Sequence, residues 1–332
     1  MILNIKYERI SHDCSFFRFI RFSAIVRQNI ETALDTMNAF NNAIRTRVID
    51  EKTHPLSEYK EKYPNDTHLH DFVEKSSVTS FEQMISFSDS LVLGGSNTNS
   101  FITQLSNFVA SIFVQYSEPF RKNFSKIEDV KSDFATATGN GSYYKHMAFP
   151  IMFRGGISVG NDVGFFNEYH IKDTEFKFAS LNVLGLTYLN AVKLETTDRG
   201  PRLFCDKSVV DATINKKTIR VVNEDNEIYE IVWTIEGCEA MGRSSNYWSN
   251  VENAINDKLL PSSINLYNYY KNKPGTVTMQ YKNLLDLVCT GIVKYAKDKC
   301  DRESDAIEYI NKKLNEAELP TISISIIDGF LE

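Results

Sequence analysis

The stretch CSFFRFIRFSAIVRQNIETALDTMNAFNNAIRTRV, residues 14–48, contains the change of pattern on which the fold prediction rests. Its first nine residues are rich in aromatic and β-branched side chains, which is typical of a buried strand. After them, apolar side chains recur at helical spacing: Ile25, Ile30, Ala33, Leu34, Met37, Phe40 and Ile44. The sequence therefore predicts a buried strand that runs directly into one amphipathic helix.

The segments that follow continue this alternation of strands and helices. The expected order is a hairpin over 81–95 (FEQMISFSDSLVLGG), a helix over about 101–120, a strand within 147–160 (MAFPIMFRGGISVG), a strand within 167–179, a helix over 181–195 and a strand over 201–206. Such an order predicts an α/β sheet covered by helices. It is close to the β-α-β-β-α-β order of ferredoxin-like folds.

Two parts of the chain differ in character. Residues 14–206 are expected to form one α/β domain, with polar excursions from the core over 49–80 and 121–145. Residues 207–332 are expected to form a C-terminal extension, in which a β-hairpin over 216–233 is followed by helices near 245–259, 277–299 and 303–316.

Composition and charge restrict the function classes. The chain has 332 residues and a net charge of −6, which argues against a nucleic-acid-binding face. No apolar run approaches the ~20 residues that a membrane span needs, and the start lacks the apolar region of a secretory signal. The five cysteines show no CxxC spacing, so neither a disulfide framework nor a zinc site is expected. They indicate buried thiols in the reducing cytoplasm.

The hairpin turn contains a candidate metal ligand. Phe87, Ser88, Asp89 and Ser90 place a carboxylate between two short strands. Magnesium prefers oxygen ligands and commonly bridges a carboxylate to substrate phosphates. Two interpretations fit the local sequence, because an aspartate at such a position also caps its own turn in many hairpins.

Two further motifs contain candidate substrate contacts. In RGGISVG, residues 154–160, Arg154 can contact phosphate while Gly155 and Gly156 let a ligand approach the backbone; a simple β-bulge explains the glycines equally well. In the predicted helix over 181–195, Asn190 and Lys193 lie three residues apart and can reach a ribose and a phosphate. A solvated helix face is the alternative.

Taken in this order, FSDS, RGGISVG, GLTYLNAVKLE and the Pro201-Arg202 strand resemble the class III nucleotidyl cyclases. They look most like the pyrimidine cyclases of bacterial Pycsar antiphage systems, and the resemblance covers residues 14–206. It implies conversion of CTP or UTP to cyclic CMP or cyclic UMP, as a signal to a separate effector protein. An adenylate or guanylate cyclase is the alternative enzyme.

The resemblance also implies a site and an assembly. Two magnesium or manganese ions would be held by two aspartates, one of which matches Asp89, and a homodimer would complete the active sites. The other aspartate is expected in a Phe-x-Asp pattern before the first helix, where this sequence has Phe19-Ile20-Arg21. An arginine cannot bind a cation. Either the alignment is shifted, or the chain is an inactive nucleotide-binding variant, or another acid such as Asp13 takes this role.

The predicted helix over 181–195 departs from the family as well. Purine cyclases of this class show an asparagine followed, four positions later, by an arginine. The aligned residues here are Leu189 and Lys193. Lys193 can stabilise phosphate as a point charge, without the bidentate geometry of arginine. The resemblance implies such altered positions in a pyrimidine cyclase.

Overall fold

The computed structural model describes residues 2–10, 13–19, 22–49, 60–67, 70, 80–137, 144–170, 177–242, 246–273 and 275–332. Arg21 and most of the excursion 49–80 lie outside these described residues. Among the described residues, no helix combines the length and the hydropathy that a membrane span requires.

The centre of the molecule is a β-α-β-β-α-β unit. Its elements are β2 (Asp13–Phe19), α1 (Phe22–Gln28) with α2 (Ile30–Ile44), β3 (Gln83–Phe87), β4 (Ser90–Gly95), α5 (Thr98–Tyr116) and β5 (Phe153–Val159). The four strands lie in the order β3-β4-β2-β5, and each neighbouring pair is antiparallel. This is the ferredoxin-like arrangement, and the expectation of a ferredoxin-like α/β sheet covered by helices is confirmed.

The sheet continues beyond this unit. Strand β8 (Leu203–Asp206) runs parallel to β5, and β10 (Ile228–Ile231) and β9 (Ile219–Asn223) complete a seven-stranded sheet. The predicted hairpin over 216–233 is therefore present, and its strand β10 pairs with β8. The expected boundary at residue 206 falls inside the sheet, immediately before the short helix α8 (Lys207–Ala212).

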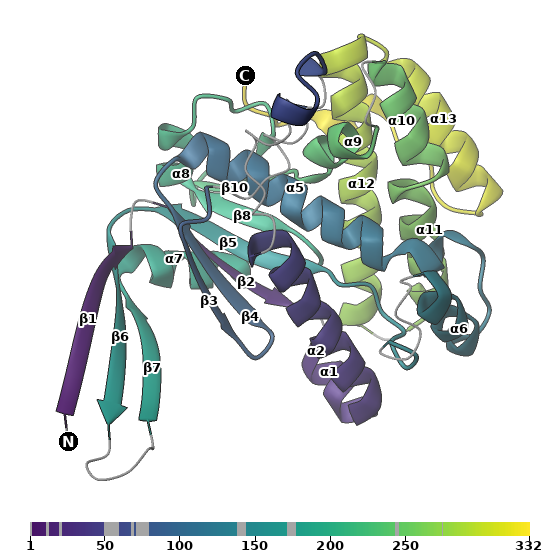
Figure 1. Cartoon of the computed structure of the whole chain (residues 1–332). Helices are drawn as coiled ribbons and strands as arrows, with labels where there is room; N and C mark the ends of the chain where they lie inside the picture. Colours follow the sequence, from purple (N-terminus) through teal and green to yellow (C-terminus); the bar gives the residue numbers. More distant parts are fainter. Residues whose placement is uncertain are drawn as a thin grey trace.

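A second, three-stranded sheet projects from the main body (Figure 1). It consists of β1 (Ile2–Ile10), β6 (Asp162–His170) and β7 (Lys177–Leu184), paired antiparallel in the order β1-β6-β7. In place of the one strand expected within 167–179, this range contains the end of β6 and the beginning of β7. The helix expected over 181–195 is present but shorter, because β7 extends to Leu184 and α7 (Leu186–Glu195) begins after Gly185.

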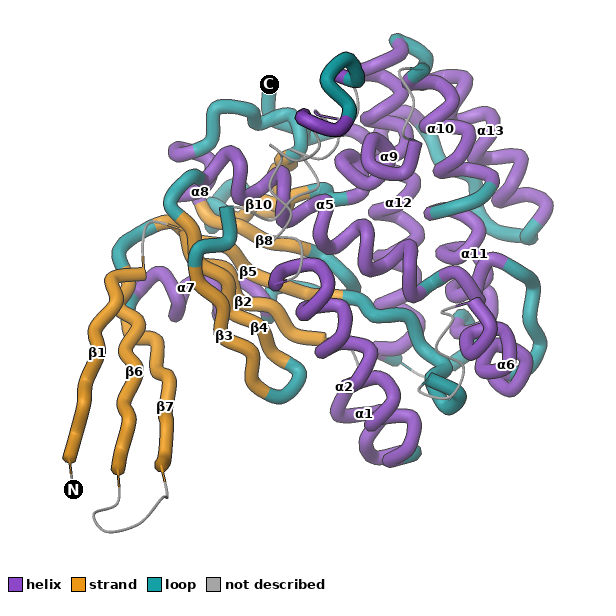
Figure 2. Tube along the Cα trace, viewed as in Figure 1, coloured by secondary structure: helices purple, strands orange, loops and turns teal. Residues whose placement is uncertain are grey.

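One face of the large sheet carries the main hydrophobic core. Helices α2 and α5 cover it, and Phe40, Phe108 and Phe153 form an aromatic group between them and the sheet. The C-terminal helices contribute to the same core. They are α9 (Thr234–Gly242), α10 (Tyr247–Asn256), α11 (Leu259–Tyr270), α12 (Thr276–Cys300) and α13 (Glu303–Glu316), and Figure 2 shows them gathered on one side of the molecule. The helices predicted near 245–259, 277–299 and 303–316 are thus present.

The other face of the sheet has much less cover. Helix α7 packs there, and its Ala191 contacts Phe16 of β2 and Val92 of β4 in a small cluster. The excursion predicted over 121–145 also needs correction, because it contains α6 (Ile127–Ala137), whose Val130 reaches the main core.

Candidate functional site

The β3–β4 turn presents a carboxylate that its own hairpin does not use. Ser88, in the left-handed region at φ 53°, and Asp89 form the turn, and Phe87 pairs with Ser90 across it. Asp89 is half-buried, and its contact among the described residues is a long hydrogen bond of 3.4 Å from Ser90 Oγ. Because no backbone N–H in this part of the structure donates to Asp89, the turn-capping interpretation is not supported.

The strand register places an arginine beside this carboxylate. Arg18 of β2 lies opposite Ser90 of β4 on one side and opposite Arg154 of β5 on the other. Among the described residues of β2, Arg18 is therefore the one next to the turn that carries Asp89. Arg21 lies outside the described residues, so its expected place at a metal position stays a prediction.

The same register excludes the alternative acid. Asp13 pairs with Gly95 and Val159, at the opposite end of β2 from the turn. Strands rise about 3.3 Å per residue, so five residues separate Asp13 from Arg18 by roughly 16 Å. Within the described ranges, no group of three or more His, Cys, Asp or Glu residues could hold a metal ion. The residues next to Asp89 therefore do not fit a site for two metal ions.

Arg154 is committed to a buried ion pair. Its Nε and Nη2 donate to Glu195 Oε1 at 2.7 and 2.5 Å, and the Glu195 side chain is only 1% exposed. Glu195 is the last residue of α7, so this pair joins the end of the helix to the sheet. The predicted phosphate contact by Arg154 is not supported by this geometry, and its partner was not recognised in the sequence.

The glycines of RGGISVG allow α7 to approach the sheet. A Cβ atom on Gly156 would lie 2.0 Å from the carbonyl oxygen of Ala191, and one on Gly160 would lie 2.4 Å from Thr187 Oγ1. The β2–β5 register runs without a shift through Gly155 and Gly156, so the β-bulge explanation is wrong as well. The close approach predicted for a ligand is made by the helix instead, and Gly155 is buried.

The outer surface of α7 carries the predicted polar pair. Asn190 and Lys193 are exposed, while Ala191 faces the sheet. Because Glu195 contacts Arg154, whose neighbour on β2 is Arg18, the last turn of α7 lies at the same end of the sheet as the Asp89 turn. The last turn of α7, which carries Lys193 on its outer surface, therefore lies at the end of the sheet where Arg18 and the Asp89 turn are found.

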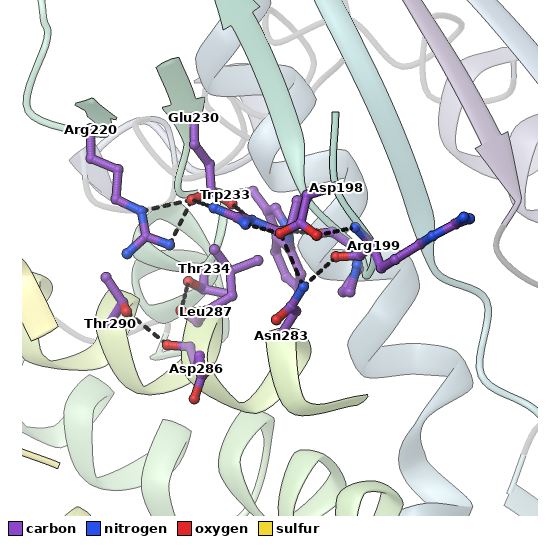
Figure 3. A network of polar contacts seen from close by, with 12 residues as sticks. Asp198, Arg199, Arg220, Glu230, Trp233, Thr234, Asn283, Asp286, Leu287 and Thr290 are labelled. Atoms are coloured by element: carbon purple, nitrogen blue, oxygen red, sulfur yellow. Dashed lines mark hydrogen bonds and ion pairs between the residues drawn. The ribbon is translucent and has the colours of Figure 1, made fainter. Parts of the chain in front are cut away.

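A second buried carboxylate lies farther along this face (Figure 3). Glu230 of β10 is fully buried and accepts hydrogen bonds from Arg202 and from Arg220, at 2.6 to 2.8 Å. Arg202 also pairs with Asp198, which receives a hydrogen bond from Asn283 of α12. Burial lowers the pKa of Arg202, but Glu230 and Asp198 outweigh it and hold this pKa above its usual value. The network fastens the sheet edge to α12.

Three arginines therefore lie side by side on neighbouring strands: Arg18 of β2, Arg154 of β5 and Arg202 at the start of β8. Arg154 and Arg202 are neutralised by the buried carboxylates Glu195 and Glu230. Arg18 is exposed, rests at 5.8 Å from the Phe16 ring and forms no ion pair with any described residue. The row thus presents one uncompensated positive charge beside Asp89.

Two cavities lie elsewhere, on the helical side of the molecule. They have volumes of about 420 and 500 Å³, and α11 contributes Asn265 and Asn268 to both. Tyr269 lines the smaller one and Arg121 the larger one. Asp89, Arg154, Asn190 and Lys193 line neither of these cavities.

Comparison with known proteins finds similarity to solved structures only. No family model and no curated protein sequence matches the chain. Among solved structures it is similar to a bacterial light-regulated adenylyl cyclase (TM-score 0.39, 11% identity, 68% of this chain and 52% of that one). It is also similar to the adenylyl cyclase CyaB from P. aeruginosa (TM-score 0.35, 11% identity, 69% and 95%).

A third similar structure is a class III adenylyl cyclase-like ATP-binding protein from Pseudomonas aeruginosa (TM-score 0.34, 11% identity, 65% of this chain and 36% of that one). The aligned region thus spans about half the length of the light-regulated cyclase and a smaller part of this third protein. Similarities at these TM-scores assign no activity to this chain.

Proposed function

We propose that the α7 face of the sheet binds a nucleoside triphosphate and that the chain is a nucleotidyl cyclase acting on CTP or UTP. The observation that supports this most is that Arg18, the Asp89 turn and the last turn of α7, which carries Lys193, lie at one end of that face. Two cationic side chains and one carboxylate suit a triphosphate with a bound divalent cation. These residues belong to the segments that resemble the class III cyclases.

The proposed reaction is an internal displacement at phosphorus. The ribose 3′-oxygen bonds to the α-phosphorus, the bond from that phosphorus to the α,β-bridging oxygen breaks, pyrophosphate leaves, and the 3′-hydroxyl proton passes to water. Arg18 and Lys193 would stabilise the negative charge that spreads over the phosphate oxygens. A magnesium or manganese ion held by Asp89 would supply further charge neutralisation.

The proposed active form is a homodimer. Leu184, Leu186 and Leu189 are more than half exposed around the start of α7, on the face of the sheet that has the least cover. Apolar side chains gathered in this way are typical of a protein interface. A second copy of the chain would cover them and would complete the walls of the nucleotide site.

The choice of a pyrimidine base rests on the departures in α7. Leu189 stands at the position that is asparagine in the purine cyclases, and Lys193 replaces their arginine. The further role, a cyclic nucleotide signal to a separate effector protein in antiphage defence, rests on the resemblance alone.

A product screen tests the proposal. The purified chain is incubated separately with ATP, GTP, CTP and UTP plus manganese, and products are identified by mass spectrometry. The expected result is a cyclic pyrimidine nucleotide that is lost in Asp89→Ala and retained in Asp225→Ala, a matched change in the exposed β9–β10 turn. A cyclic purine product would contradict the base assignment, and no cyclic product would contradict the enzyme.

A second candidate function is favoured by Arg18. Because an arginine occupies the position beside Asp89, the chain would then bind a nucleoside triphosphate without turning it over, as a catalytically inactive relative of a cyclase. Tight binding of CTP or UTP with no cyclic product, and product from Arg18→Asp, would distinguish this candidate from the active enzyme.

A further inference from the structure

We infer that the triphosphate is held with a single divalent cation at Asp89, and that the guanidinium of Arg18 supplies the positive charge of a second. This inference rests on the proposed nucleotide site. It concerns how the phosphates are bound, and it applies both to an active cyclase and to an inactive binding module.

The charges support the idea that an arginine replaces one carboxylate together with its metal ion. A carboxylate with a divalent cation carries a net charge of +1, and so does an arginine without any ion. The guanidinium also presents five N–H donors in a planar fork that matches two phosphate oxygens. An arginine beside Asp89 therefore preserves the attraction for the triphosphate while it removes the ligand for one ion.

The surroundings of Arg18 leave its guanidinium available. Arg154 and Arg202, the next two arginines across the sheet, are each held by a buried glutamate. Arg18 is exposed, and the Phe16 ring at 5.8 Å supports it from the same face of β2. No described acidic residue pairs with it, Asp89 included, so its charge is available to an anion from solution.

Arg18 also lies next to the turn that carries Asp89. It lies on β2, the strand between β4 and β5, directly opposite Ser90, the residue that follows Asp89. A phosphate group next to an ion at Asp89 would lie within reach of the long arginine side chain. The other described carboxylate at this end of the sheet, Glu195, is already paired with Arg154, and Asp13 lies at the opposite end of β2.

Counting bound manganese in the nucleotide complex tests the inference. The full chain is saturated with α,β-methylene CTP, or with the UTP, ATP or GTP analogue that binds best, and bound Mn²⁺ is measured by equilibrium dialysis and electron paramagnetic resonance. We expect one Mn²⁺ per bound nucleotide in the native chain and two in Arg18→Asp. Arg18→Ala should weaken nucleotide binding by about tenfold, since it removes a charge-assisted contact.

Two variants serve as controls. Arg18→Lys keeps the charge without the fork and should weaken binding less than Arg18→Ala does. Arg27→Ala removes an exposed arginine from the last turn of α1 and should leave the affinity unchanged.

The experiment distinguishes failure of this inference from failure of the proposed function. Two Mn²⁺ per nucleotide in the native chain, or an unchanged affinity in Arg18→Ala, would overturn the inference and leave the nucleotide site standing. If none of the four nucleotide analogues binds, both the inference and the proposed function are overturned.

Discussion

Glu195 at the end of α7 and Arg154 on β5 form an ion pair of 2.5 Å in which the glutamate is almost completely buried. The pair fixes the position of α7 along the sheet, because it joins the last turn of the helix to β5, the strand next to β2. It therefore determines where Lys193 lies relative to Arg18 and Asp89. Arg154, which the sequence suggested as a substrate contact, instead positions the helix that we propose to bind the nucleotide.

Breaking this pair should destabilise the whole chain. Glu195→Ala leaves the Arg154 guanidinium partly buried without its counter-charge, so the free energy of unfolding should fall by about 3 kcal/mol. Urea denaturation followed by circular dichroism measures this change. Glu308→Ala, an exposed glutamate of α13, should cost less than about 0.5 kcal/mol. If the two substitutions lowered the free energy of unfolding equally, the ion pair would not stabilise the fold.

The contact between α7 and β5 should not tolerate a methyl group. Gly156→Ala would place a Cβ atom 2.0 Å from the Ala191 carbonyl oxygen, so the helix would have to move. We expect a loss of about 3 kcal/mol in unfolding free energy together with loss of nucleotide binding. Gly275→Ala meets no neighbouring atom, but the backbone there, at φ +61° and ψ −120°, strains any side chain, so it should cost about 1–3 kcal/mol and leave nucleotide binding intact. Unchanged binding in Gly156→Ala would contradict the role given to α7.

The proposed dimer predicts a difference between two exposed apolar residues. Leu186 is 76% exposed on α7, and Ile214 is 88% exposed on the segment after α8. Leu186→Arg should convert the dimer to a monomer in sedimentation equilibrium, because a charge in an apolar interface loses its hydration. Ile214→Arg should leave the dimer unchanged. If the native chain sediments as a monomer at all concentrations, or if only Ile214→Arg dissociates it, the proposed interface is wrong.

The contributions of Glu230 and Arg220 to the free energy of unfolding should depend on one another. Glu230→Gln leaves Arg202 and Arg220 without their shared buried counter-charge, and the free energy of unfolding should fall by about 3 kcal/mol. Arg220→Met should lower the free energy of unfolding less when it is combined with Glu230→Gln than when it is made in the native chain. A double-mutant cycle from denaturation curves should give a coupling energy of about 1–3 kcal/mol. Simple additivity would show that the two residues do not depend on one another.

The central fold could be predicted because local patterns specified its elements. The switch from an aromatic strand to a helical repeat within residues 14–48, and the two short apolar runs around Ser88 and Asp89, are enough to define the strand–helix–hairpin unit. The small sheet could not be foreseen. Its register pairs Ile2 with His170, and no local signal records contacts at such a distance along the chain. The apolar run before Gly185 suited both the end of β7 and the start of α7.

The sequence proposes only part of the candidate site. Asp89, Asn190 and Lys193 are candidates because their segments carry recognisable motifs. Arg18 does not stand out in the sequence, because the spacing Phe-x-Arg occurs twice, at Phe16 and at Phe19, and strand pairing is needed to show that Arg18 lies beside the turn. The commitment of Arg154 depends on Glu195, a residue 41 positions away, so sequence spacing could not reveal it.

Hydrogen–deuterium exchange with and without CTP and UTP tests most directly where the nucleotide binds. The account predicts slower exchange in residues 14–19, 83–95 and 186–195 when the nucleotide and manganese are present, and no change in Asp89→Ala. Protection confined to α11, which lines the cavity of about 500 Å³ with Asn265 and Asn268, or no protection anywhere, would contradict a nucleotide site on the α7 face.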